Sequence, residues 1–138
     1  MEIIVKNLKQ TEKLARKFAK NLKGGEKILL NGDLGAGKTT FTKFLAKALG
    51  VKDAVTSPSF TILKQYSGKK LNINHFDLYR IETEDELIEI GFQEFLNTSN
   101  NEILLIEWAE RANFDKSNFI KIDISKIDEN KRIFNIAK

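Results

Sequence analysis

A chain of 138 residues, 41% hydrophobic and 30% charged, is long enough to bury one core, so a single domain over residues 1–138 is expected. The absence of cysteine and the single histidine exclude disulfides, thiolate metal sites and zinc clusters. The net charge of +4 is spread over scattered lysines with no basic block, so direct nucleic-acid binding is not expected as the main function. Without a secretory signal or an apolar run near ~20 residues, we expect a cytoplasmic protein that does not contact membranes.

The first third of the chain predicts alternating strands and helices. Residues 3–5 predict a short strand, and residues 11–22 predict a helix with its apolar side chains on one face. Residues 27–31 form an apolar run between turn residues, which is typical of a buried strand. A second amphipathic helix carries apolar residues from Phe41 to Leu49 and ends at Gly50.

A glycine-rich segment joins that buried strand to the second helix and matches the pattern G-x-x-x-x-G-K-[ST] in full. The glycines allow backbone N–H groups to point at phosphate oxygens, and the helix that follows presents its positive end to the same anion. Lys38 can reach the β- and γ-phosphates, and the Thr39 hydroxyl can occupy one Mg²⁺ coordination position. The sequence therefore predicts Mg²⁺ and ATP as cofactors, bound by Asp33, Leu34, Gly35, Ala36, Gly37, Lys38, Thr39 and Thr40.

The middle of the chain predicts two strands and a capped helix. Residues 60–66 and 71–76 predict strands joined by a turn. Thr83-Glu84-Asp85-Glu86 is a capping box that opens a helix through Ile90, and residues 92–96 add a short turn.

The C-terminal third completes the predicted sheet. Residues 103–106 are the most apolar run and predict a central strand, whereas residues 119–124 and 132–136 alternate and predict an antiparallel hairpin. The expected fold class is α/β, a P-loop NTPase-like three-layer sandwich. Its central sheet is expected to be mostly parallel, with antiparallel hairpin additions.

Two acidic residues follow predicted strands. Glu107 follows residues 103–106 and Asp77 follows residues 71–76, and open α/β sheets bind ligands at such strand ends. Either carboxylate could hold the metal while the other orients the attacking water. The alternatives are that Glu107 is an N-cap or a salt-bridge partner of Arg111, and that Asp77 caps a turn.

Four segments resemble the bacterial TsaE/YjeE family, the ATPase component of tRNA threonylcarbamoyladenosine biosynthesis, and their order and spacing match over nearly the whole chain. The phosphate loop is generic, whereas the histidine-containing segment and the Glu-Trp pair make the resemblance specific. The segments are Gly32 to Thr40, Thr56-Ser57-Pro58-Ser59-Phe60, His75-Phe76-Asp77-Leu78-Tyr79-Arg80, and Glu107-Trp108.

This resemblance implies a weak ATPase that acts with TsaD- and TsaB-type subunits, with tRNA contacted indirectly. It implies that Thr39 and Glu107 hold Mg²⁺, that Asp77 serves hydrolysis together with Lys38, and that residues 56–60 form a switch-like loop. Ser59 stands where threonine is common in the family.

For each of Trp108, His75 and Arg80, the sequence leaves two roles open. Trp108 is expected to sense the nucleotide or to belong to the core, and His75 to serve the site or to be a core histidine. Arg80 could stabilise γ-phosphate charge or form a salt bridge.

Three other functions compete with ATP hydrolysis. A small-molecule kinase needs several arginines and a lid, but the chain has four arginines and no lid-sized insertion. A GTPase needs Asn-Lys-x-Asp, whereas Asn130-Lys131 is followed by Arg132-Ile133. The third alternative is an adaptor whose nucleotide is only structural.

Overall fold

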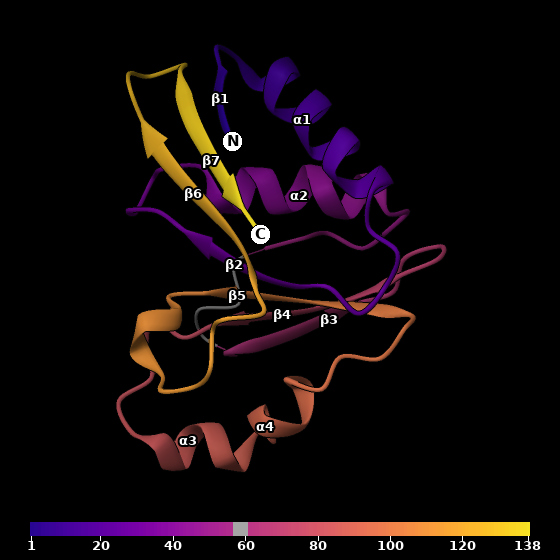
Figure 1. The fold of residues 1–138 in the computed structure, drawn as a ribbon, viewed down its shortest axis with the longest axis vertical. Coiled ribbons are helices and arrows are strands. Elements are labelled where there is room, and N and C mark those ends of the chain that lie inside the picture. The colour runs from indigo at the N-terminus through magenta and orange to yellow at the C-terminus, as the bar shows by residue number, and fades with distance from the viewer. Residues whose placement is uncertain (57–60) are drawn as a thin grey trace.

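The computed structural model describes residues 1–56 and 61–138, and its centre is a seven-stranded sheet (Figure 1). The strand order across the sheet is β1-β7-β6-β2-β5-β4-β3. The strands are β1 Glu2–Val5, β2 Lys27–Asn31, β3 Leu63–Tyr66, β4 Asn72–Asp77, β5 Glu102–Glu107, β6 Ile120–Lys126 and β7 Arg132–Ala137. The helices are α1 Leu8–Lys20, α2 Lys38–Ala48, α3 Glu84–Glu89, α4 Phe92–Phe95 and the 3-10 helix η1 Ala109–Arg111.

The sheet is mixed. Strands β6, β2, β5 and β4 are parallel to one another, whereas β1, β7 and β3 each pair antiparallel. The expectation of a mostly parallel sheet therefore describes the four central strands. The antiparallel additions lie at both edges, and the predicted C-terminal hairpin is confirmed as β6 and β7.

The expected three layers are present, because α1 and α2 cover one face of the sheet and α3 and α4 the other (Figure 1). Successive residues of β2 serve the two cores in turn. Ile28 and Leu30 pack in the cluster that contains Phe41 of α2, whereas Leu29 packs in the cluster that contains Phe92 of α4. Burial on both faces explains why this strand reads as a continuous apolar run.

Several element boundaries differ from the sequence-based expectation, and the structure shows where three elements begin. Helix α1 begins at Leu8, not at residue 11, because the Asn7 side chain caps it by accepting a hydrogen bond from the Gln10 amide at 2.9 Å. Strand β3 begins at Leu63, and residue 60 lies outside the described residues. Helix α2 begins at Lys38, inside the glycine-rich motif itself.

The capping box is confirmed, since the Glu86 carboxylate accepts a hydrogen bond from the Thr83 amide at 3.2 Å. No helix in residues 1–56 and 61–138 has the length and apolar character that a membrane span requires.

Candidate functional site

The glycine-rich loop runs from the end of β2 into the first turn of α2. Gly35 and Gly37 have φ values of 81° and 111°, in the left-handed region that favours glycine. Gly37 immediately precedes α2, and no side chain in the described part of the chain caps that helix start. Its first amide groups are therefore free to bind an anion, as the motif predicts.

Lys38 lies over this loop and is largely buried. Its Nζ donates a hydrogen bond to the Gly32 carbonyl at 2.6 Å and stands 4.1 Å from the centre of the Trp108 ring. The ammonium group is thus held between the start of the loop and an aromatic face, next to the start of α2.

A cleft of about 390 Å³ opens beside the loop. It brings together residues from the loop, the ends of β4 and β5, and the start of β7. Its lining comprises Leu34, Gly35, Gly37, Lys38, Thr39, Thr40, Asp77, Tyr79, Arg80, Glu107, Trp108 and Arg132. Two predicted loop residues do not line this cleft: Asp33 lines a separate hollow beside β6, and Ala36, which is buried, lines that hollow and a further one on the other side of the loop.

The two acidic residues are direct neighbours across the sheet. Asp77 and Glu107 are register partners at the carboxyl ends of the parallel strands β4 and β5. Both side chains are almost fully buried. Alternation along the strands places them on the face covered by α2, together with Ile73 and Leu105, so both carboxylates reach the cleft.

The alternative reading of Asp77 as a turn cap is also observed. Its Oδ1 accepts a hydrogen bond from the Tyr79 amide at 3.0 Å, so one carboxylate both fixes the turn after β4 and lines the cleft.

Glu107 has a different partner from the one that the sequence suggested. The alternative of a salt bridge to Arg111 is wrong, because Glu107 Oε2 lies 2.6 Å from His75 Nε2 inside the protein. The N-cap alternative is also wrong, since the residue that caps η1 is Trp108. Arg111 instead lies over the Tyr79 ring, 5.5 Å from its centre. His75 Nδ1 has no partner among the described residues, so the tautomer with its hydrogen on Nε2, donated to Glu107, fits both nitrogens.

Replacing His75 by Ala is expected to lower the free energy of unfolding by about 3 kcal/mol, because it leaves a buried carboxylate without its partner. Chemical denaturation at neutral pH measures this. The matched control is the double variant His75→Leu/Glu107→Leu, which removes both polar groups and should recover part of the loss. An unfolding midpoint for His75→Ala equal to that of the wild type would contradict the assigned role of this pair.

Trp108 lies between the core and the cleft, and its role in sensing a nucleotide stays a prediction. It is only partly buried, packs against the core beneath α3 and α4, and lines the cleft. Its backbone is left-handed, with φ 57°, which is uncommon for a bulky residue and places the ring beside Lys38. Its ring centre lies 4.8 Å from that of Tyr79, so two aromatic rings border the cleft.

Arg132, at the start of β7, was missed by sequence reasoning. Its Nε donates to the Ala36 carbonyl of the glycine-rich loop at 2.9 Å, and its Nη1 donates to the Asp128 carbonyl at 2.7 Å. Backbone N–H groups of Asn130 and Lys131 hold the pKa of Asp128 below its usual value and fix the same turn. Arg132 therefore connects the β6–β7 turn to the glycine-rich loop across 96 positions of sequence.

Replacing Arg132 by Ala is expected to raise the Kd for a bound nucleotide about tenfold, because a charged hydrogen bond that shapes the loop is lost. Isothermal titration measures the change. Lys131→Ala, which removes a neighbouring exposed cation, is the control and should bind as the wild type does. Equal effects of the two substitutions would show that Arg132 acts only through net charge.

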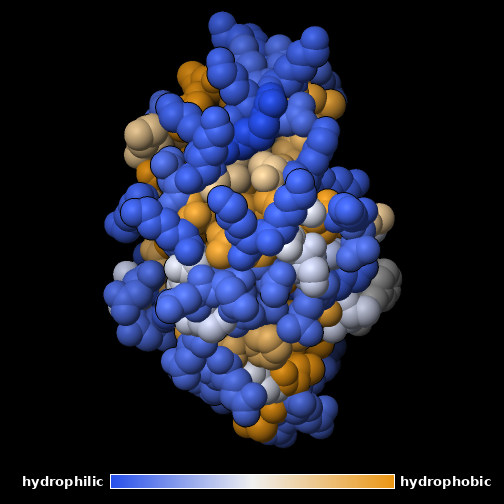
Figure 2. All heavy atoms as spheres, turned by 90° about the vertical axis from the view of Figure 1, so that its right-hand side faces the viewer, coloured by the Kyte–Doolittle hydropathy of each residue, from blue (hydrophilic) through white to orange (hydrophobic). Residues whose placement is uncertain are grey.

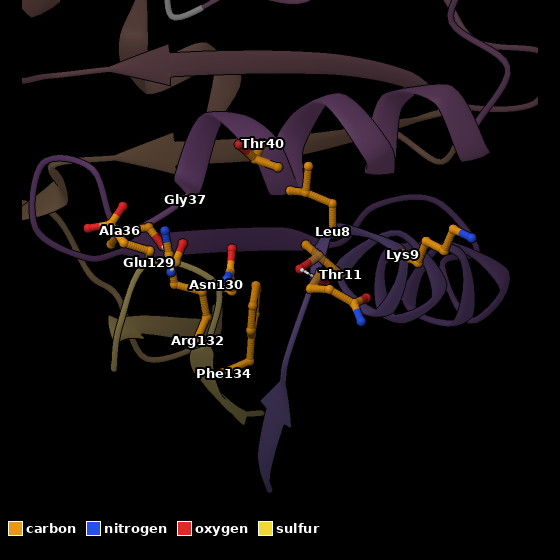
Figure 3. A pocket seen from close by; sticks show the side chains of 11 residues that line it. Leu8, Lys9, Thr11, Ala36, Gly37, Thr40, Glu129, Asn130, Arg132 and Phe134 are labelled. Atoms are coloured by element: carbon orange, nitrogen blue, oxygen red, sulfur yellow. Dashed lines mark hydrogen bonds between the residues drawn. The ribbon is translucent and has the colours of Figure 1, made fainter.

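A second hollow of about 590 Å³ lies on the other side of the loop (Figure 3). Its walls come from the start of α1, the start of α2 and the β6–β7 hairpin, with Leu8, Thr40, Asn130 and Phe134 around the opening (Figure 3). Gly37, Thr40 and Arg132 line both this hollow and the acidic cleft. One elongated ligand could therefore lie along the loop with an end in each.

A divalent cation fits the donor set of the acidic cleft. Among residues 1–56 and 61–138 there is no cluster of three or more histidine, cysteine, aspartate or glutamate side chains that would form an all-protein metal cage. Thr39 and Glu107 line the same cleft and offer oxygen donors, which suit Mg²⁺ when phosphates and water complete its shell.

The predicted switch-like loop falls largely outside the described residues, which omit 57–60. Thr56, just before this gap, is held by Tyr66, whose hydroxyl donates to the Thr56 carbonyl at 3.2 Å. Burial raises the pKa of Tyr66, so this hydroxyl keeps its proton over the neutral pH range.

Known proteins of similar sequence and structure cover nearly the whole chain. The family model described as threonylcarbamoyl adenosine biosynthesis protein TsaE matches residues 5–134. The tRNA threonylcarbamoyladenosine biosynthesis protein TsaE of Aquifex aeolicus is 46% identical over 133 residues, 95% of this chain and 91% of that protein. The protein of the same name from Rickettsia prowazekii is 41% identical over 132 residues, 94% and 90% of the two chains. A crystal structure of Bacillus subtilis YdiB superposes with a TM-score of 0.72 at 32% identity, over 99% of this chain and 83% of that one.

Proposed function

Because the chain belongs to the TsaE family, we propose that it is an ATP-binding, slowly ATP-hydrolysing subunit that supports threonylcarbamoyladenosine formation on tRNA. The observation that carries the ATPase part is one cleft that joins the phosphate loop to two buried carboxylates at strand ends. Such a cleft offers both anion binding and a means of placing a metal and a water molecule.

In this proposal the triphosphate lies over the start of α2. The free amide groups and Lys38 bind its oxygens, and the nucleoside extends into the second hollow between α1 and the β6–β7 hairpin (Figure 3). Polar groups of Asn7 and Asn130 line that hollow and can bind the edge of a base.

The two carboxylates take separate roles. Thr39 and Glu107 would hold Mg²⁺, which neutralises phosphate charge during hydrolysis, and His75 orients the Glu107 carboxylate through their hydrogen bond. Asp77 is left to orient the attacking water, since its turn-capping hydrogen bond holds its carboxylate in place.

Hydrolysis by the isolated chain is expected to be slow. The cleft is open to solvent beside the exposed side chains of Leu34 and Arg80, so water is not excluded from the reacting phosphate. Closure by TsaD- and TsaB-type subunits in the cytoplasm would complete the site, and we propose these proteins as partners.

Titration calorimetry with ATP and GTP in the presence of Mg²⁺ tests the proposal. We expect ATP to bind and GTP to bind more weakly, and we expect slow phosphate release that rises when the partner subunits are added. A clear preference for GTP, vigorous turnover by the chain alone, or rapid phosphoryl transfer to a nucleoside monophosphate would each overturn it.

A further inference from the structure

Six cationic side chains meet at the edge of the sheet opposite the phosphate loop. They line a hollow of about 880 Å³, here called the basic groove. Its cations are Arg16, Lys20, Lys23, Lys47, Lys69 and Lys70.

The topology gathers these residues from distant parts of the chain. Lys23 precedes β2, and Lys69 and Lys70 precede β4, so they lie at the amino ends of parallel strands. Arg16 and Lys20 belong to the second half of α1. Because the parallel strands end at the phosphate loop, their beginnings meet at the other edge, on the right-hand side of Figure 1. Figure 2 shows this side of the molecule, which is covered mostly by hydrophilic residues.

The charge of the basic groove is largely uncompensated. No acidic side chain lines it, and Lys47 alone of its six cations forms an ion pair within the described residues, with Glu12 at 3.2 Å. The nearby Glu26 carboxylate accepts hydrogen bonds from the Lys23 and Gly24 amides and does not pair with the groove lysines.

Helix termini account for only part of this charge. Cations in the last turn of a helix are favoured by its dipole, which covers Lys20 and Lys47. Lys23, Lys69 and Lys70 lie in loops, where no such effect applies. A bound polyanion would relieve the repulsion between these like charges.

The chemistry of the lining favours nucleic acid over an acidic protein. Protein interfaces are depleted in lysine and enriched in aromatic anchors, but the basic groove has five lysines and no aromatic side chain in its lining. Lysine, arginine and asparagine are side chains that bind phosphate and sugar oxygens, and Asn100 and Asn101 also line the groove.

We propose that the basic groove binds the phosphate backbone of RNA without reading its sequence. Choosing tRNA as the RNA rests on the proposed function. Under this proposal the chain contacts tRNA directly, not only through its partners as the sequence led us to expect. The contact surface lies at the opposite end of the parallel strands from the proposed ATP site.

The test compares two triple variants that remove the same charge. Lys20→Gln/Lys69→Gln/Lys70→Gln removes three of the six cations of the groove, and the control, Lys6→Gln/Lys121→Gln/Lys126→Gln, removes three exposed lysines outside it. Fluorescence anisotropy with an unmodified tRNA transcript, without nucleotide, gives Kd at several salt concentrations. The groove variant should bind about tenfold more weakly, and its slope of log K against log salt should fall by about 2, whereas the control should match the wild type.

Three outcomes would overturn the proposal: no tRNA binding by the wild type, equal weakening in both variants, or loss of assembly with the partner subunits while tRNA affinity is kept. The last would identify the groove as a protein-docking face. Calorimetry with ATP on the same proteins keeps the two proposals apart. If the wild type binds ATP and the groove substitutions leave tRNA affinity unchanged, only the RNA-binding proposal fails. If the wild type binds tRNA through the groove but does not bind ATP, only the proposed ATPase function fails.

Discussion

Replacing Lys38 by Ala is expected to abolish measurable ATP binding, with Kd rising about 100-fold or more. The largely buried ammonium group sits at the start of α2, held by the Gly32 carbonyl and the Trp108 ring, where it faces the anion site. Charge-assisted hydrogen bonds contribute about 1.5–3 kcal/mol each, and the β- and γ-phosphates would lose at least one apiece. Isothermal titration with Mg-ATP measures the loss.

The control for Lys38 is substitution by Met, which keeps the aliphatic stem and removes only the charge. Lys38→Met should lose binding as Lys38→Ala does, while its thermal unfolding stays close to that of the wild type. Retention of wild-type ATP affinity in either variant would sink the assignment of the loop as the phosphate site.

Replacing Asp77 by Asn is expected to leave ATP affinity within about threefold of the wild type and to lower the hydrolysis rate about 100-fold or more. An asparagine Oδ1 can still accept the 3.0 Å hydrogen bond from the Tyr79 amide, so the turn after β4 keeps its shape. What is lost is the negative charge beside the cleft that would orient water. Phosphate release under saturating Mg-ATP, alone and with partner subunits, measures the rate.

Asp77→Ala serves as the comparison, because it removes both the turn cap and the carboxylate and should also weaken the fold. Unchanged hydrolysis by Asp77→Asn would remove Asp77 from the reaction. If hydrolysis stops while tRNA modification by the assembled complex continues, the chain is an adaptor whose nucleotide is structural.

Much of the fold was predictable because its signals are local. The apolar run of residues 27–31, the capping box at Thr83 and the alternating C-terminal hairpin each involve neighbours in sequence, and each is confirmed. The start of α1 was misplaced by three residues because the cap is Asn7, while Thr11, read as the start, lies inside the helix.

The contacts that the sequence did not determine are those between residues far apart in the chain. The sequence placed Asp77 and Glu107 each at the end of a strand, and only the register of β4 and β5 makes them direct neighbours. The sequence spacing did not show whether Glu107 pairs with His75 or with Arg111. The choice depends on which face of the sheet each side chain points to, and that is visible only in the folded structure.

The amino-acid pattern alone was sufficient to predict the glycine-rich loop between a strand and a helix, and to identify the family, since both depend on short runs of contiguous residues. That the loop binds phosphate stays a prediction. Tertiary structure alone placed Arg132 against Ala36 and collected the basic groove. Lysines that are scattered in sequence converge because parallel strands and their helices return the chain to the same edge at each crossover. Where positive charge gathers on the surface depends on that topology, so it cannot be derived from the amino-acid composition.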